Sequence, residues 1–285
     1  WQHSYQIKAE ELSSQVKITY GDSHTAYFDI TETGFEDPAG NFDILTQESD
    51  GTYRLLRQDQ TRYVFNNLGK IAQILDRNGH GLVFNYTGTV ISTITDTTGR
   101  FLLELNYTGS HLTQLTDLLG RTITYTYDPN DNLSTITDVE GGTTIYTYGE
   151  DHRVLTITDA NGHTFLTNEY DDEGRVDTQY DAEGYTTTFF YNTLDKDTYV
   201  TDRRGNITKY DYDDLGRLQG TTDALDKVTS YTYDEDYNII SETDARGNTT
   251  TFTYDDRGNQ LSRTDALGGI STSTYDAMNN PLSIT

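Results

Sequence analysis

The sequence contains no cysteine, only three prolines and a single methionine among its 285 residues. Without cysteine, a disulfide framework, a thiolate nucleophile and a cysteine-ligated metal site are all excluded. No stretch approaches the length of about 18 consecutive apolar residues that a membrane-spanning helix needs, so none is predicted.

Positive charge is also scarce, because 20 Lys and Arg stand against 46 Asp and Glu and leave a net charge of −26. Such a surface repels phosphate backbones and anionic lipids, so we expect no nucleic-acid partner and no membrane insertion. Only 33% of the residues are apolar, but the 23 Tyr and 10 Phe favour strands. The composition therefore predicts an all-β chain with an acidic, hydrated exterior.

An internal repeat of about 21 residues runs through most of the sequence. A D-x-x-G tetrad begins at Asp76, Asp96, Asp117, Asp138, Asp159, Asp181, Asp202, Asp244 and Asp265, and Asp223 keeps the register although Asp226 replaces its glycine. An aromatic residue recurs in parallel at Phe65, Tyr86, Tyr107, Tyr127, Tyr148, Tyr170, Tyr191, Tyr212, Tyr233, Tyr254 and Tyr275. Two markers that share one period over this length identify a repeat protein.

Residues 248–268 show what one unit encodes. Polar and aromatic residues alternate up to Tyr254, which is the period of a strand. A turn follows at 255–258, where Asp255 can accept a backbone hydrogen bond and Gly258 can adopt positive φ. A short return strand over 261–264 and a second turn complete the unit. Each repeat therefore predicts two strands and two tight turns, with no room for a helix.

Units of this kind are expected to pair as an antiparallel meander that places the tyrosines about 9.6 Å apart on one face. We interpret this tyrosine ladder as core and inter-strand packing, with a sugar-binding aromatic platform as the alternative. The residues assigned to the structural repeat are Tyr127, Asp128, Tyr148, Tyr170, Asp171, Gly174, Tyr191, Tyr212, Asp213, Gly216, Tyr233, Asp234, Tyr254, Asp255 and Gly258.

The return strands fit strict alternation less well. Leu133 and Ile136, like Leu112 and Leu115, are three residues apart, which would place them on opposite faces. Either a bulge lies between them or both faces are partly buried, and the sequence leaves these two alternatives open.

Two regions follow from the extent of the repeat. Residues 1–64 are predicted to form an irregular β entry or capping segment, and residues 65–285 an array of about ten to eleven repeats. The sequence starts without Met and stops where the next Asp is due, so we interpret it as a piece cut in mid-array.

These residues resemble the Rhs/YD-repeat family. Its signature, Y-x-Y-D-x-x-G-[RN]-L followed by T-D-x-x-G, stands here at residues 125–133, 210–218 and, in part, 254–259. The resemblance covers about residues 50–285. It implies a β-ribbon that curls as part of a hollow shell, as in bacterial Rhs toxins, toxin-complex components and teneurins. In the bacterial members the shell encloses a C-terminal toxic domain.

The resemblance also has limits. The family's core segment, which follows the repeats and carries a self-cleavage site, is absent from this sequence, and so is a toxin domain. About 22 strands would give about 105 Å of ribbon, or a ring about 33 Å across. We therefore expect at most part of a shell, which could line a cargo without enclosing it.

No pattern predicts catalysis, a cofactor or a metal site. The six His lie mostly in or beside turns, and no Ser-His-Asp arrangement or G-x-S-x-G motif occurs. Phosphate-binding glycine motifs are absent, and an EF-hand read from Asp211 fails at Leu215 and Thr222. Weak Ca²⁺ binding between neighbouring Asp-rich turns remains open.

Two function classes follow. The first is a non-catalytic shell segment of a secreted or cell-surface protein that encapsulates a toxin domain. The second is an extracellular filament-forming, adhesive or carbohydrate-binding surface protein. The expected partners are the rest of a longer chain, with further repeats, a core segment and a toxin cargo, or identical subunits joined through strand edges, together with surface glycans.

Overall fold

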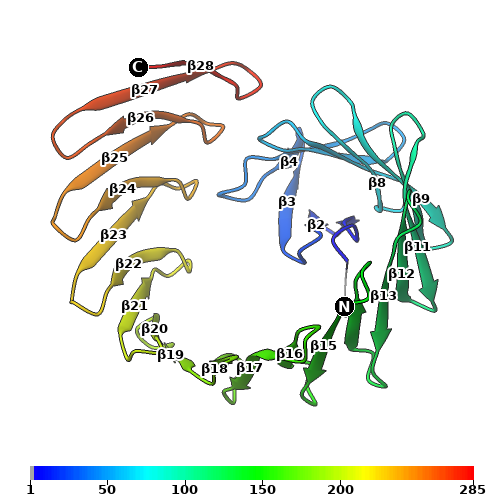
Figure 1. Cartoon of the computed structure of the whole chain (residues 1–285). Coiled ribbons are helices and arrows are strands. Elements are labelled where there is room, and N and C mark those ends of the chain that lie inside the picture. The colour runs from blue at the N-terminus through cyan, green and yellow to red at the C-terminus, as the bar shows by residue number, and fades with distance from the viewer. Residues whose placement is uncertain (1–2) are drawn as a thin grey trace.

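The computed structural model describes residues 3–285, and Figure 1 shows their arrangement. These residues form 28 β-strands and no helix, which confirms the predicted all-β ribbon. Within them, accordingly, no helix is long and apolar enough to cross a membrane.

The first four strands form a small antiparallel sheet in the order β1-β2-β3-β4. They are β1 (Lys8–Glu11), β2 (Gln15–Thr19), β3 (Thr25–Thr31) and β4 (Gly34–Glu36). Alternation of buried and exposed side chains gives this sheet one apolar face, which carries Val16, Ile18 and Phe28.

The other 24 strands among the described residues form one large antiparallel sheet. They are β5 (Ile44–Gln47), β6 (Tyr53–Leu56), β7 (Arg62–Phe65), β8 (Ile71–Leu75), β9 (Gly81–Thr87), β10 (Val90–Asp96), β11 (Phe101–Thr108), β12 (His111–Asp117), β13 (Thr122–Tyr127), β14 (Leu133–Thr137), β15 (Thr143–Tyr148), β16 (Val154–Thr158), β17 (Thr164–Tyr170), β18 (Val176–Asp181), β19 (Thr186–Asn192), β20 (Asp197–Thr201), β21 (Ile207–Tyr212), β22 (Leu218–Thr222), β23 (Val228–Tyr233), β24 (Ile239–Thr243), β25 (Thr249–Tyr254), β26 (Gln260–Thr264), β27 (Ile270–Tyr275) and β28 (Pro281–Ile284).

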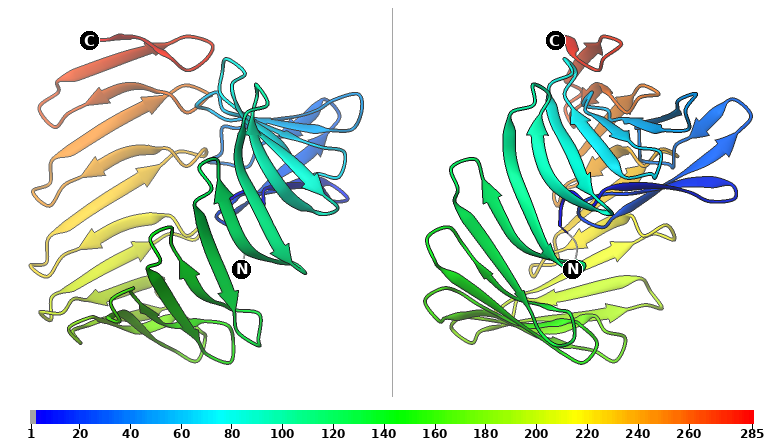
Figure 2. Two further views of the ribbon diagram at one scale, coloured as in Figure 1. Left: turned by 45° about the vertical axis from the view of Figure 1, so that its right-hand side comes forward. Right: turned by 90° about the vertical axis from the view of Figure 1, so that its right-hand side faces the viewer.

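The large sheet is a meander, in which each strand pairs with its neighbours in sequence. It curves through most of a turn, so that β28 comes back toward the first strands (Figures 1 and 2). No pairing in residues 3–285 joins β28 to β5, and the ribbon is therefore an open ring.

Side chains bridge the opening of this ring, at a contact that we name the seam. The amide of Gln58 donates to the carbonyl of Arg257 at 2.7 Å, and the amide of Asn279 donates to the carbonyl of Gln58 at 2.9 Å. Phe42 packs so closely on Gly258 that a Cβ there would lie 2.4 Å from its ring. Turns of the last repeats thus contact Phe42, just before β5, and Gln58, in the turn between β6 and β7.

Bulges explain the return strands. Tyr127 pairs with Leu133 and Thr126 with Thr135, so Ser134 is an extra residue that shifts the register. Leu133 and Ile136 therefore share a face in spite of their spacing. The same shift occurs at Leu112 and recurs in most of the later hairpins, including those that begin at Tyr212 and Tyr254. Of the two alternatives left open by the sequence, the bulge is the one present.

The hairpin turns have the predicted conformation. Gly174, Gly216 and Gly258 have φ of 81°, 77° and 74°, which only glycine adopts without strain. Where the fourth turn residue is not glycine, the same left-handed conformation persists, as at Asp226 with φ of 58° and Asn279 with φ of 61°. The left-handed turn conformation is thus a feature of the repeat, and glycine adopts it with the least backbone strain.

The main core lies between the two sheets. The apolar face of β1–β4 packs on the concave side of the ring, against residues of β5–β12 (Figure 1). Phe28, Ile18, Phe65 and Ile71 are essentially inaccessible to solvent. Fully burying a side chain of this size stabilises the fold by about 2 kcal/mol. The amino-terminal sheet therefore plugs one part of the ring.

Candidate functional site: the concave face

A ladder of tyrosines lines the concave side of the ring. Tyr127, Tyr148, Tyr170, Tyr191, Tyr212, Tyr233 and Tyr254 are all half-buried and follow one another along the ribbon. They share a face with Tyr86 and Tyr107, which contact the core under the amino-terminal sheet. The predicted ladder thus faces the inside of the ring.

Hydrogen bonds tie seven of the rungs to the previous unit. The hydroxyls of Tyr86, Tyr127, Tyr170, Tyr191, Tyr233, Tyr254 and Tyr275 donate to the carbonyls of Ile71, Leu112, Val154, Val176, Leu218, Ile239 and Gln260 at 2.6–3.1 Å. Each acceptor is the residue that pairs with the preceding aromatic rung, next to the bulge. The tyrosine hydroxyl and the carbonyl beside the bulge therefore form a recurring contact that joins consecutive repeats.

The turns after the tyrosine strands form one edge of the ribbon, which we name the YD rim. It carries Asp128, Asp171, Asp213, Asp234 and Asp255 together with Gly174, Gly216 and Gly258. The remaining turns, which begin at the aspartates of the D-x-x-G tetrads, lie at the other end of the strands. The predicted site residues are thus spread along a face and a rim and do not converge on one pocket.

The turn carboxylates are engaged within their own turns. Asp128 Oδ1 accepts from the backbone N–H groups of Asn130 and Asn132, each at 2.9 Å. Its Oδ2 accepts from the Asn132 amide at 2.9 Å. The side-chain bond from Asn132, with the backbone bonds, lowers the pKa of Asp128. Aspartate therefore acts here as a turn-closing acceptor.

Arginines link some of these turns to the ladder. Arg175 donates from Nε to Asp171 at 2.7 Å, and its guanidinium lies 4.5 Å from the ring centre of Tyr191. Arg217 repeats the arrangement, with Asp213 at 2.6 Å and the ring of Tyr233 at 4.9 Å. Each cation thus joins a rim carboxylate to the next aromatic rung.

The covered and open parts of this face differ. Under the amino-terminal sheet, the ring nitrogen Nε2 of His3 lies 3.0 Å from the Tyr107 hydroxyl, and the rings of Tyr5 and Phe84 are 5.3 Å apart. Across the ring, Figure 1 shows no element of residues 3–285 on the concave side of β19–β26. One and the same surface is therefore plugged in its first part and open in its second.

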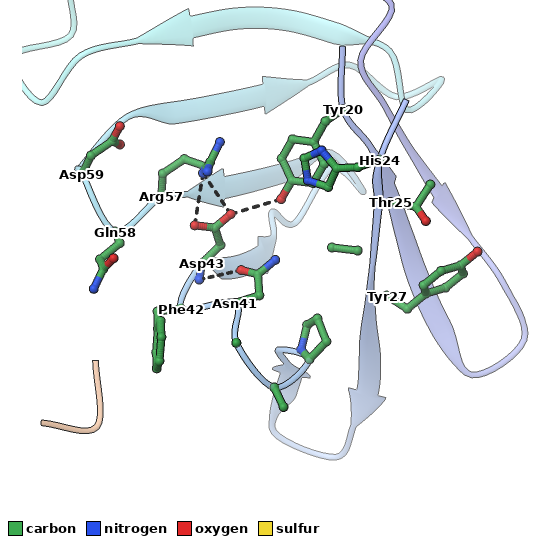
Figure 3. Close-up of a pocket in the computed structure, with 14 residues that line it drawn as sticks. Tyr20, His24, Thr25, Tyr27, Asn41, Phe42, Asp43, Arg57, Gln58 and Asp59 are labelled. Atoms are coloured by element: carbon green, nitrogen blue, oxygen red, sulfur yellow. Dashed lines mark hydrogen bonds and ion pairs between the residues drawn. The ribbon is translucent and has the colours of Figure 1, made fainter. Parts of the chain in front are cut away.

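A pocket of about 570 Å³ lies where the amino-terminal sheet meets the seam (Figure 3). Asp43 is buried there and bonds the Nε of Arg57 at 3.0 Å and the hydroxyl of Tyr20 at 3.1 Å. Burial, followed by the charge of Asp43, raises the pKa of Tyr20. The imidazole of His24 stacks on the Tyr20 ring with centres 4.0 Å apart.

This pocket was not predicted from the sequence, because its residues lie outside the repeat and no motif marks them. It holds no activated nucleophile, and the ion pair anchors the segment that carries Phe42 into the seam. Residues 3–285 also contain no cluster of three or more His, Asp or Glu placed to hold a metal ion. Weak Ca²⁺ binding by the turns stays a prediction.

The chain is similar to known proteins both in its repeat sequence and in its fold. The family model described as RHS Repeat matches residues 106–143, 127–164, 212–249, 233–270 and 254–285. No curated protein sequence matches.

Two solved structures illustrate the shared fold. A crystal structure titled as TcdB2-TccC3-Cdc42 has a TM-score of 0.52 at 13% identity, over 94% of this chain and 20% of that one. A Photorhabdus luminescens Tc holotoxin pore has a TM-score of 0.53 at 13% identity, over 95% of this chain and 20% of that one. The present chain thus spans about a fifth of the length of these structures. The chain thus contains repeats of the Rhs/YD type over residues 106–164 and 212–285, and its ribbon has the same fold as these Tc structures.

Proposed function

We propose that this chain is a non-catalytic wall segment of an Rhs-type shell, and that its open concave face lines a cavity holding a toxin domain. The observation that carries the proposal is the tyrosine ladder. The same face is built from β7 to β28, but the amino-terminal sheet covers only its first part. A surface of half-buried aromatic rings is suited to contact with polypeptide.

The covered part of the face serves as a precedent for such contact. There, residues 3–36 place Ile7, Ile18 and Phe28 against the ring and bring a His3 nitrogen to the hydroxyl of Tyr107. On the open part of the concave face, an enclosed polypeptide would contact the same kinds of groups, namely the edges of aromatic rings, hydroxyls and few charged side chains. This similarity supports a wall that contacts its cargo.

A scaffold role also explains the residues of the repeat. The tyrosines hold consecutive units together, and the aspartates and glycines shape the turns, so these residues have a structural purpose that needs no catalysis. We keep residues 1–64 as the entry segment and 65–285 as the repeat array. In this division β5–β7, although they precede the repeats, start the large sheet.

The proposed partners are other parts of a longer chain. The matched solved chains are about five times as long as this one, since it covers 20% of each, and one of them is titled a Tc holotoxin pore. We therefore propose further repeats and a cargo within the same polypeptide, in a protein that is secreted or displayed at the cell surface.

Electron microscopy of the protein purified from its native host tests this function. Discrete hollow particles, whose enclosed polypeptide resists protease until the particles are denatured, are the expected result. Filaments that grow by addition of identical subunits, with no protected polypeptide inside, would overturn the proposal and favour the extracellular filament.

A further inference from the structure

The convex face of the ribbon has its own repeating feature. Opposite the tyrosine ladder, two convex residues face each other in each hairpin, and five hairpins place a pair of hydroxyls there. These pairs are Thr126–Thr135, Thr147–Thr156, Thr232–Ser241, Thr253–Ser262 and Thr274–Ser283, at 2.6–2.7 Å. In these five hairpins the outer surface at this level therefore consists of small, hydrated side chains.

One hairpin breaks the row with aromatic residues. In β19–β20 the equivalent pair is Phe190 and Tyr199, whose ring centres lie 5.9 Å apart at an angle of 45°. Phe190 is 62% exposed, so its ring gains little from packing within the chain. Leaving a phenylalanine ring in water where the repeats on either side carry Glu169 and Asp211 has no benefit for folding.

Polar groups surround this aromatic pair. Tyr199 pairs across the next strand with Lys209, whose ammonium lies 3.1 Å from Asp197 and also contacts Asp211. A hollow of about 460 Å³ lies beside Tyr199 and Lys209, and Asn206, Thr222 and Asp223 are among its lining residues. An aromatic platform thus borders a concave, polar surface.

The same hairpin departs from the repeat in a further way. Its strands pair without the register shift seen in most of the other repeat hairpins. The family model matches residues up to 164 and again from 212, which leaves out this stretch. Several independent features therefore single out β19–β21 as a local specialisation of the array.

We propose that Phe190 and Tyr199, with the hollow beside them, form a binding site for a neutral oligosaccharide on the convex face. The CH-bearing face of a sugar ring packs on an exposed aromatic ring, while its hydroxyls need donors and acceptors at the edge of that ring. Tyr199 supplies the ring, and Asn206, Thr222 and Asp223 supply such groups.

The charges around the site select against anionic ligands. The chain has a net charge of −26, and Asp223 and Asp226 line the hollow, so an anionic glycan would be repelled. Lys209 is the hollow's cation, and it is already held by Asp197 and Asp211. A ligand rich in hydroxyls and free of charge fits these surroundings best.

Isothermal titration calorimetry with a fixed panel of hexasaccharides tests the site in the whole chain. The neutral probes are maltohexaose, cellohexaose, chitohexaose and mannohexaose, and an oligomer of uronic acid serves as the anionic probe. The key variant is the double substitution Phe190→Thr with Tyr199→Thr, which introduces the threonine pair found in the hairpins β13–β14 and β15–β16 and should leave the fold intact. Phe101→Thr, on distant β11, is the matched control for loss of an exposed ring.

At least one neutral probe is expected to bind, with affinity that falls by about tenfold or more in the double variant and is unchanged in Phe101→Thr. Circular dichroism and thermal unfolding show that each variant is folded. The proposal is overturned if no neutral probe binds, if only the anionic probe binds, or if the double variant binds as well as the parent. A protein ligand that loses affinity in the double variant, without any sugar binding, would assign the surface to a protein partner instead.

Discussion

The hydroxyl of Tyr254 on β25 donates to the backbone carbonyl of Ile239 on the adjacent strand β24 at 3.0 Å. Ile239 is itself the partner of Tyr233, the preceding rung, and lies beside a bulge. Consecutive repeats are therefore joined by a side chain as well as by the strand ladder. This contact makes the position of each tyrosine depend on the unit before it.

Removing the hydroxyl of this contact tests its value. Tyr254→Phe is expected to lower the free energy of unfolding by about 1 kcal/mol, the net value of one hydrogen bond. Tyr254→Ser also removes the ring and should cost about 3 kcal/mol or more. Urea titration measures both, and Tyr27→Phe, at an exposed ring of β3, is the control. Equal stability of Tyr254→Phe and the parent would show that the bond contributes nothing.

Substitution of two turn glycines distinguishes the cost of backbone strain from the cost of a clash at the seam. Gly216 and Gly258 both have positive φ, but a Cβ would meet nothing within 4 Å at Gly216 and the ring of Phe42 at Gly258. Gly216→Ala is therefore expected to cost about 1 kcal/mol of unfolding free energy from strain alone. Gly258→Ala should cost more and should raise hydrogen exchange around residues 41–43. Equal costs would mean that Phe42 moves aside freely.

Acid sensitivity should come from the turn carboxylates. The bond from the Thr98 hydroxyl, at 2.6 Å, and the backbone bonds lower the pKa of Asp96 to about 2. A carboxyl with a depressed pKa in the folded state stabilises the fold above its unfolded pKa of about 3.8. This contribution is therefore lost as the pH falls from about 4 to 2.

The pKa of Asp96 can be followed by NMR titration of its carboxyl carbon. Thr98→Val removes the first cause of the shift, so the pKa is expected to rise toward its ordinary value. Thr113→Val, on β12 away from this turn, should leave it unchanged. A pKa of Asp96 that stays near 2 in Thr98→Val would assign the shift to the backbone bonds alone.

The ion pair between Asp43 and Arg57 is expected to stabilise the seam. Asp43→Ala leaves the Arg57 guanidinium and the Tyr20 hydroxyl without their shared acceptor. We expect a loss of about 2 kcal/mol in unfolding free energy, below the cost for a fully buried pair because Arg57 is partly exposed. Calorimetric unfolding measures the loss, and Asp59→Ala, at an exposed position in the same pocket, is the control. A loss no greater than in Asp59→Ala would contradict the role given to Asp43.

The conformation of the repeats could be predicted from the sequence, but the contacts at the seam that bridge the opening of the ring could not. Tyr254, Asp255 and Gly258 recur at one period, so local rules for strands and turns predict their conformation. The spacing of Leu133 and Ile136 pointed to a bulge as one of two alternatives. Phe42 on Gly258, by contrast, is a contact between distant parts of the chain that no period encodes.

The position of the amino-terminal sheet inside the ring was beyond prediction for the same reason. The sequence predicted β structure for residues 1–64, but the partner of the apolar face of this sheet depends on how far the ribbon curves. Phe190 and Tyr199 could have been noticed from the sequence, since they replace Thr at a fixed repeat position. Their shared exposed face became evident only from the register of β19 and β20.

Site-specific photo-crosslinking tests most directly the claim that the concave face lines a cavity with polypeptide inside. Tyr231 lies on the concave face and Thr232 on the convex face of the same strand, β23. The crosslinking amino acid p-benzoylphenylalanine is placed at either position in the protein made by its native host. The account predicts crosslinks from position 231 to an enclosed polypeptide and none from position 232. Crosslinks to polypeptide from position 232 alone, or from neither position, would contradict it.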